Sequence, residues 1–161
     1  SSMKEYAELL KDDPEYHTKA ARFSEITQDV TEFLVGLPFQ APMTAVPRKV
    51  TYQDPCHLAH AQRITPAPRT ILNSIPGLEL VEMENSSLCC GGAGIYSSVQ
   101  PILSKRLLKR KMASIDATDS QEVITANPGC MLQLEMGFKS QGKHGRVRHV
   151  VDILDEAYGL E

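Results

Sequence analysis

The first third of the chain has the hydrophobic spacing of helices. Residues 3–11 favour a short helix that ends at Asp12-Asp13-Pro14. A longer amphipathic helix with one buried face is predicted next, and Gly36 and Pro38 end it. Its apolar positions recur at spacings of three and four residues: Phe23, Ile26, Val30, Phe33 and Leu34. We interpret this part as packing helices without chemistry, followed by an ordered linker from Phe39 to Pro47.

From residue 49 onward, strand patterns alternate with helix patterns. Strands are predicted at residues 50–53, 78–83, 122–126 and 147–149, where short apolar stretches are bounded by turn residues. Helices are predicted at residues 57–62, 68–74, 131–138 and 151–158. A further helix is capped by Ser97 or Ser98. Its predicted apolar face consists of Ile102, Leu103, Leu107, Leu108, Met112 and Ile115.

This alternation predicts an α/β fold. The sheet is expected to be mostly parallel, Rossmann-like or flavodoxin-like, with about four strands flanked by helices. An N-terminal helical segment, residues 1–38, precedes the α/β domain of residues 39–161. Because the sequence enters helical pattern directly after Ser1-Ser2, we expect it to be part of a longer polypeptide, with residues 1–38 as the connection to a preceding unit.

Composition narrows the class of protein. The 161 residues are 42% hydrophobic and 23% charged, with a formal net charge of -3, which is typical of a soluble globular domain and gives no indication of nucleic-acid binding. No apolar stretch approaches the roughly 20 residues of a membrane span, and no signal peptide opens the sequence. We therefore expect a cytoplasmic location. No Ser–His–Asp arrangement, P-loop or GxGxxG sequence indicates a hydrolase or a nucleotide site.

The four cysteines stand where three predicted strands end. Cys56 follows the first strand, Cys89 and Cys90 follow the second, and Cys130 follows the third. In an open α/β sheet these strand ends share one edge, which is where ligands bind. The sequence therefore predicts that three distant loops bring four thiols together.

Adjacent cysteines followed by glycines indicate a metal centre. A disulfide between Cys89 and Cys90 would strain the peptide that joins them. Gly91 and Gly92 permit a sharp bend and a close approach of backbone N–H groups to an anionic centre. Zinc sites usually contain short C-x₂₋₄-C pairs, which this sequence lacks, whereas an iron–sulfur cluster accepts ligands from several loops. An iron–sulfur cluster is thus favoured, and zinc or redox-active free thiols are the alternatives.

Three motifs resemble those of the cysteine-rich "CCG" domain. They are Asp54-Pro55-Cys56-His57-Leu58, Cys89-Cys90-Gly91-Gly92-Ala93-Gly94-Ile95-Tyr96 and Asn127-Pro128-Gly129-Cys130. This domain occurs, usually twice in tandem, in the cysteine-rich subunit of heterodisulfide reductases and in iron–sulfur subunits of glycolate- and lactate-oxidising complexes. The present chain most resembles the C-terminal half of the glycolate oxidase iron–sulfur subunits. The resemblance implies a preceding first CCG repeat and, further upstream, a ferredoxin-like domain.

The resemblance also implies a ligand set and its limit. Cys56, Cys89, Cys90 and Cys130 would ligate a [4Fe–4S] cluster bordered by Gly91 and Gly92, and the alternative is an empty site in a chain without the preceding repeat. For His57 three roles are open: a hydrogen bond to the cluster, a substitute zinc ligand, or an exposed residue at the start of a helix. The fuller family motif ends in Cys-x-x-Cys, but Gln133 stands in the place of the last cysteine. Gln133 is therefore expected to line the site, and a five-thiolate cluster with direct disulfide reduction is not expected.

The implied function is electron transfer without a catalytic residue in this chain. Electrons would pass from a flavin-containing 2-hydroxy-acid dehydrogenase subunit to a quinone or another acceptor, with any membrane association peripheral and through the complex. The alternatives are a zinc-bound or metal-free docking domain and a thiol–disulfide reductase module. His60 is expected at the surface, and Asp54 is expected to orient or cap the first loop. A basic helical face, solvated or directed at an acidic partner, is expected from Lys105, Arg106, Lys109, Arg110 and Lys111.

Overall fold

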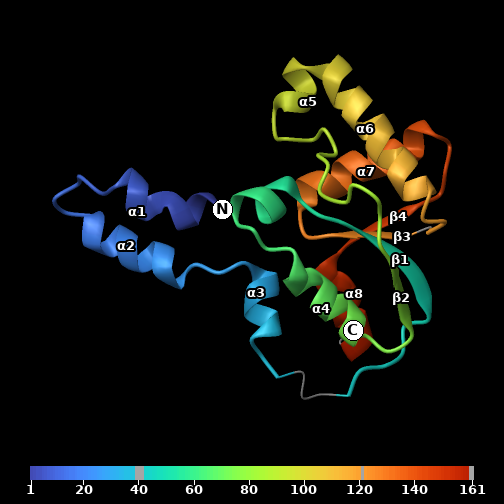
Figure 1. The fold of residues 1–161 in the computed structure, drawn as a ribbon, viewed down its shortest axis with the longest axis horizontal. Coiled ribbons are helices and arrows are strands. Elements are labelled where there is room, and N and C mark those ends of the chain that lie inside the picture. The colour runs from blue at the N-terminus through green and yellow to red at the C-terminus, as the bar shows by residue number, and fades with distance from the viewer. Residues whose placement is uncertain (39–41, 121, 160–161) are drawn as a thin grey trace.

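The structure, a computed structural model, describes residues 1–38, 42–120 and 122–159 (Figure 1). The N-terminal part contains the 3₁₀ helix η1 (Ser2–Glu5) and the α-helices α1 (Tyr6–Leu9), α2 (His17–Ile26) and α3 (Val30–Val35). The α/β part has four strands, β1 (Arg48–Gln53), β2 (Leu78–Val81), β3 (Glu122–Thr125) and β4 (Arg146–His149). Its helical elements are the π-helical turn η2 (His57–Ala61), α4 (Pro66–Ser74), α5 (Tyr96–Val99), α6 (Pro101–Asp116), α7 (Pro128–Ser140) and α8 (Val150–Tyr158).

The strands form one parallel sheet in the order β2-β1-β3-β4, which confirms the predicted α/β fold. β1 and β3 pair directly, with Val50 opposite Glu122 and Gln53 opposite Thr125. The connections after β1 and β2 run to opposite sides of β1, so the crevice between β1 and β3 is the topological switch point of the sheet.

Two apolar cores lie on the two faces of the sheet, because successive strand residues point to opposite faces. On one face, Val50, Tyr52 and Ile124 pack with residues of α4 and α8. On the other face, Val123 and Val147 pack with residues of α6 and α7. Figure 1 shows these helix pairs on the two sides of the sheet. No helix within the described ranges is long and apolar enough to span a membrane.

The predicted single helix through Phe23 and Leu34 is wrong. Helix α2 ends at Ile26 and α3 begins at Val30. The break is stabilised by a capping box, in which the Asp29 side chain accepts from the Thr31 N–H and Glu32 accepts from the Asp29 N–H.

The single buried face predicted for this helix is also wrong. Phe23, Ile26 and Phe33 are 40%, 57% and 54% exposed. For Phe23 and Ile26 the reason is that η1, α1 and α2 pack mainly on one another and project from the α/β body (Figure 1). Phe33 lies on α3, where Leu34 and Val35 pack on the core instead. The Lys4–Glu32 ion pair at 2.7 Å ties this arm to α3. Within the predicted linker, residues 42–47 contain neither helix nor strand. Residues 39–41 lie outside the described residues, and the predicted domain boundary between residues 38 and 39 falls at their edge.

The predicted start of the long helix is also corrected. Ser97 and Ser98 lie within the short helix α5, and α6 begins at Pro101 with Gln100 as its N-cap. Proline suits this first position because its fixed φ and missing N–H cost nothing there. The apolar face is buried only in part, since Ile102 is 69% exposed and Leu103 45%. Leu108, Met112 and Ile115 are buried as predicted.

Candidate metal centre

The carboxyl edge of the sheet gathers the cysteines. Cys56 lies three residues after β1, and Cys130 lies in the first turn of α7, after β3. Cys89 and Cys90 lie in the loop between β2 and α5. The Cys90 and Cys130 sulfur atoms are 3.5 Å apart, and both residues are buried. Cys89 is a neighbour of Cys90 and Cys56. Burial is the main cause that raises the pKa of Cys89, and these two neighbours raise it further. The structure thus brings the four predicted residues together, and their role as ligands stays a prediction.

The loop that carries Cys89 and Cys90 is fastened to two neighbouring loops and to α6. The Asp54 N–H donates to the Ser86 carbonyl at 3.1 Å, and a ring nitrogen of the exposed His60 lies 3.1 Å from the Ser87 carbonyl. From the other side, the Ser104 hydroxyl of α6 donates to the Gly91 carbonyl at 2.9 Å. These contacts fix the position of the two thiols relative to Cys56 and Cys130.

Gly91 is required by close packing against α6. Its φ is +90°, and a Cβ atom there would lie 2.5 Å from the Ser104 carbonyl oxygen. A side chain is therefore excluded both by backbone conformation and by space. The Gly91 N–H also donates to the Cys89 sulfur at 3.3 Å. A Cβ atom on Gly92 would lie 3.6 Å from the Cys90 sulfur, so this glycine borders the site as well.

Gln133 holds the cysteine turn through hydrogen bonds. Its buried amide donates to the Cys90 carbonyl at 3.3 Å and to the Ser104 hydroxyl at 3.2 Å. Gln133 therefore lies against the cysteine turn and positions the backbone of Cys90. A direct role of Gln133 toward a cofactor remains a prediction.

Asn127 connects His57 with Cys130. Its side-chain oxygen accepts from the Cys130 N–H at 2.9 Å and so caps α7. This contact turns the Asn127 amide nitrogen toward His57 Nε2, 2.8 Å away, where it donates. The accepting Nε2 atom places the proton of a neutral His57 on Nδ1, which agrees with a pKa lowered chiefly by burial. Asn127 is a positioning residue that the motif alone did not reveal.

Asp54 orients the first loop through a buried ion pair. Its two oxygens accept from Arg69 of α4 at 2.8 and 2.9 Å, a bidentate geometry. Burial would raise the pKa of Asp54, but the hydrogen bonds from Arg69 and Ser86 outweigh it and lower the pKa. The predicted orienting role of Asp54 thus has a partner, Arg69, which the sequence did not identify.

The thiols have unequal acidities. The hydrogen bond shared with Cys130 lowers the pKa of Cys90 to about 6, against burial, and N–H groups of the turn and Lys111 add to this effect. The same contact and burial raise the pKa of Cys130. Cys90 is therefore the more acidic of these two thiols. A thiolate is the form in which cysteine binds metals.

Lys111 corrects the predicted basic face. Lys105, Arg106, Lys109 and Arg110 are exposed, but Lys111 is fully buried. Its ammonium donates to the carbonyl oxygens of Asn85 at 2.9 Å and Ser86 at 2.8 Å. The helical spacing contained the signal, because Lys111 falls between Leu108 and Ile115 on the buried stripe of α6.

A single metal ion and an iron–sulfur cluster require different arrangements of protein ligands. Within the described ranges, no three His, Cys, Asp or Glu side chains are arranged to hold one metal ion. The four thiols instead approach from three loops, together with N–H donors and a buried cation. Soft sulfur ligands spread in this way, in surroundings that favour negative charge, fit an iron–sulfur cluster.

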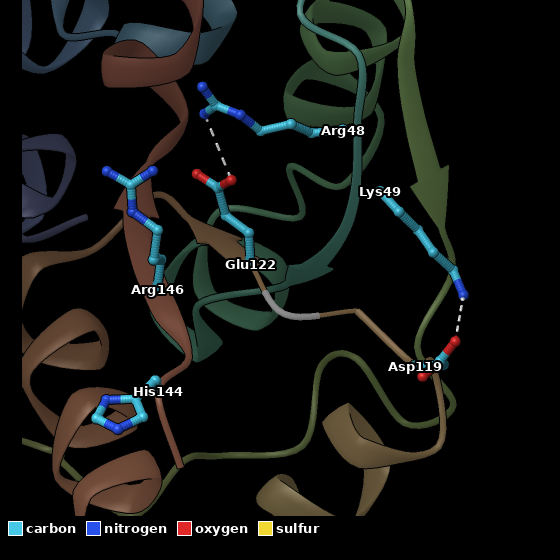
Figure 2. Close-up of a pocket in the computed structure, with 6 residues that line it drawn as sticks. All are labelled: Arg48, Lys49, Asp119, Glu122, His144 and Arg146. Carbon is cyan, nitrogen blue, oxygen red and sulfur yellow. Dashed lines mark hydrogen bonds and ion pairs between the residues drawn. The ribbon is translucent and has the colours of Figure 1, made fainter.

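The opposite edge of the sheet has a different cavity, of about 440 Å³. It lies at the amino ends of β1, β3 and β4, and Figure 2 shows the six residues that line it: Arg48, Lys49, Asp119, Glu122, His144 and Arg146. Arg48 pairs with Glu122 at 3.5 Å, and Lys49 pairs with Asp119 at 3.3 Å. The cavity contains charged side chains and no cysteine.

A parallel α/β domain with four cysteines at one sheet edge is the class of protein that these observations define. The family model described as "CCG: Cysteine-rich domain" matches residues 50–135. The chain belongs to this cysteine-rich domain family, as its motifs predicted.

The curated relatives of the chain include proteins named as iron–sulfur subunits. It is 45% identical, over 96% of its length, to the "Probable glycolate oxidase iron-sulfur subunit" of Bacillus subtilis (strain 168). It is 34% identical, over 94% of its length, to "Lactate utilization protein A" of Shouchella clausii. It is 32% identical, over 99% of its length, to the "Glycolate oxidase iron-sulfur subunit" of Escherichia coli (strain K12). The chain spans 36%, 64% and 38% of these three proteins.

Proposed function

We propose that this chain is an electron-transfer domain that binds one [4Fe–4S] cluster through Cys56, Cys89, Cys90 and Cys130. The observation that carries the proposal is the meeting of three loops at the carboxyl edge, with the Cys90 and Cys130 sulfur atoms 3.5 Å apart. The chemistry that such a cluster supplies when bound is the transfer of single electrons at a potential set by its surroundings. The thiolates would hold it, and the close packing of α6 on Gly91 would exclude water.

The proposed complex oxidises a 2-hydroxy acid such as glycolate. The names of the relatives from Bacillus subtilis and Shouchella clausii support this assignment. Electrons would come from a flavin-containing subunit and leave to a quinone or another acceptor, and this chain would not itself contain the site that oxidises the substrate. We further propose a cytoplasmic location, with peripheral attachment to the membrane through the complex, and an upstream ferredoxin-like domain and first CCG repeat in the same polypeptide.

Anaerobic reconstitution tests the cluster. The 161-residue chain is incubated with iron and sulfide, and bound iron, bound sulfide and the EPR spectrum are measured. About four iron and four sulfide per chain are expected for one [4Fe–4S] cluster. Cys90→Ser should abolish stoichiometric binding, whereas Ser98→Ala on the exposed surface of α5 should not. Full cluster content in Cys90→Ser would exclude Cys90 as a ligand, and one zinc per chain without a chromophore would support a zinc-bound docking domain.

A second candidate function, dithiol–disulfide chemistry, is favoured by the same pair of sulfur atoms. Cys90 has a lowered thiol pKa, and its neighbour Cys130 could resolve a mixed disulfide. The two residues are only 2% and 7% exposed, however, which hinders attack on a bulky disulfide substrate. Thiol quantification after incubation with oxidised glutathione separates the functions, since loss of two thiols per chain without iron binding would favour the second.

A further inference from the structure

Lys111 is a buried cation in a place where most proteins have an apolar residue. It lies in the middle of α6, and its side chain is fully inaccessible to solvent. Taking an ammonium group out of water is costly, so a buried lysine normally pairs with a carboxylate. Among the residues that the structure describes, no carboxylate forms an ion pair with Lys111. Its hydrogen-bond partners are the carbonyls of Asn85 and Ser86, with the Met83 sulfur 3.8 Å away.

The nearest buried carboxylate already has a partner. Both oxygens of Asp54 accept hydrogen bonds from Arg69, which also pairs with Glu82 at 2.7 Å. Asp54 thus spends its hydrogen bonds on Arg69 and forms no ion pair with Lys111, although its charge also acts on that ammonium group.

The thiols supply the missing negative charge. The loop that leads from Asn85 and Ser86 to Cys89 and Cys90 carries them, and Cys90 raises the pKa of Lys111 against the effect of burial, with Asp54 next. Burial lowers the pKa of Lys111 to about 8, so the ammonium group is still mostly charged at neutral pH. Its two carbonyl partners belong to the loop that continues into Cys89 and Cys90. Lys111 therefore holds the loop that leads into the sulfur centre and places its buried ammonium group beside that loop.

We propose that Lys111 is the internal counter-ion of the thiolate centre and raises the reduction potential of the cluster bound there. This inference rests on the proposed function. Reduction adds one electron to a centre that is already anionic, and a nearby cation in a region of low dielectric stabilises the added charge. Lys111 is a positioning and electrostatic residue, since it neither ligates the cluster nor meets a substrate.

The test compares midpoint potentials of reconstituted proteins by EPR-monitored redox titration. Lys111→Met removes the charge and retains the length of the side chain, so its potential should shift to more negative values. Lys111→Arg should remain near the wild type. Lys109→Met, which removes an exposed lysine two residues earlier on the same helix, should not shift the potential.

A second pair of variants retains Lys111 and its loop contacts. Met83→Glu places a carboxylate beside the ammonium and neutralises its field, which should also lower the potential, whereas Met83→Gln should not. This pair decides the question if Lys111→Met does not fold, as judged by circular dichroism. Loss of the cluster from a folded, neutralised variant also supports the counter-ion role. An unchanged potential at full cluster content in either neutralised variant overturns it, whereas a wild-type chain that binds no cluster contradicts the proposed function itself.

Discussion

Charged side chains are paired differently at the two edges of the sheet. At the amino edge, Arg48 and Arg148 share the carboxylates of Glu122 and Glu156, so positive and negative charges lie side by side (Figure 2 shows Arg48 and Glu122). Hydrogen bonding to Glu156 raises the pKa of Arg48, and hydrogen bonding from Arg148 lowers the pKa of Glu156. Among the described residues these four side chains pair with one another, although Glu122 Oε1 accepts no hydrogen bond.

At the carboxyl edge the compensation is incomplete. Asp54 and Arg69 form an ion pair, but the buried ammonium group of Lys111 forms no ion pair with a carboxylate among the described residues, and Cys90 has a lowered pKa. Buried charged groups that form no ion pair with an oppositely charged side chain mark the carboxyl edge as the candidate for function. Four kinds of substitution test this contrast between the edges.

The largest effect is expected at the cysteine turn. Gly91→Ala forces a Cβ atom to within 2.5 Å of the Ser104 carbonyl oxygen at a φ of +90°, so the free energy of unfolding should fall by about 4 kcal/mol. Gly94→Ala is the matched control, because its φ is +59° and no atom lies within 4 Å of the added carbon. It should cost about 1 kcal/mol. Urea unfolding measures both, and equal losses would show that α6 does not press on Gly91.

The buried ion pair of the same edge should have the next largest effect. Asp54→Asn leaves Arg69 with Glu82 alone and should lower the free energy of unfolding by about 3 kcal/mol at pH 7. Because the folded pKa of Asp54 is below its unfolded value of about 4, the stabilisation is fully present above that value and is lost as pH falls through the folded pKa. The variant should therefore lose less stability than the wild type between about pH 5 and pH 2. Parallel losses would contradict the lowered pKa.

The amino edge should respond more weakly. Glu122→Gln removes a buried carboxylate near Arg48 and Arg148, but both arginines retain Glu156, so a loss of about 2 kcal/mol is expected. Asp119→Asn should leave stability unchanged, since the Asp119 side chain is 98% exposed. Thermal unfolding measures the stability, and reconstitution should give the wild-type iron content in both. Loss of iron in Glu122→Gln would show that the two edges are not independent.

The smallest effect is expected at the cap of α7. Asn127→Ala removes the acceptor for the Cys130 N–H and should cost about 1 kcal/mol of unfolding free energy. Asn127→Asp keeps the acceptor and loses the donor to His57, so it should restore most of the stability. Urea unfolding of the two variants separates the capping role from the contact with His57. Equal destabilisation would assign the main role to His57.

The sequence by itself determined the alternation of strands and helices and the position of each cysteine after a strand. Those features are local, because a strand or helix shows its period in its own residues. Parallel pairing then places the loops after β1, β2 and β3 at one edge, so the meeting of Cys56, Cys89-Cys90 and Cys130 could be inferred from the sequence. The cysteine-rich family could be recognised from the same motifs.

Only the tertiary structure decided which polar residues serve that edge. Arg69 reaches Asp54 across 15 residues of sequence, Ser104 meets Gly91 across 13, and Lys111 reaches Asn85 and Ser86 across 26 and 25. Such partners depend on how a helix lies on a loop, which hydrophobic period does not encode. Lys111 shows the difference most clearly. Its charge predicted exposure to solvent, whereas its helical position put it on the buried stripe. The packing of α6 against the cysteine loop then fixed its ammonium group at the carbonyls of Asn85 and Ser86.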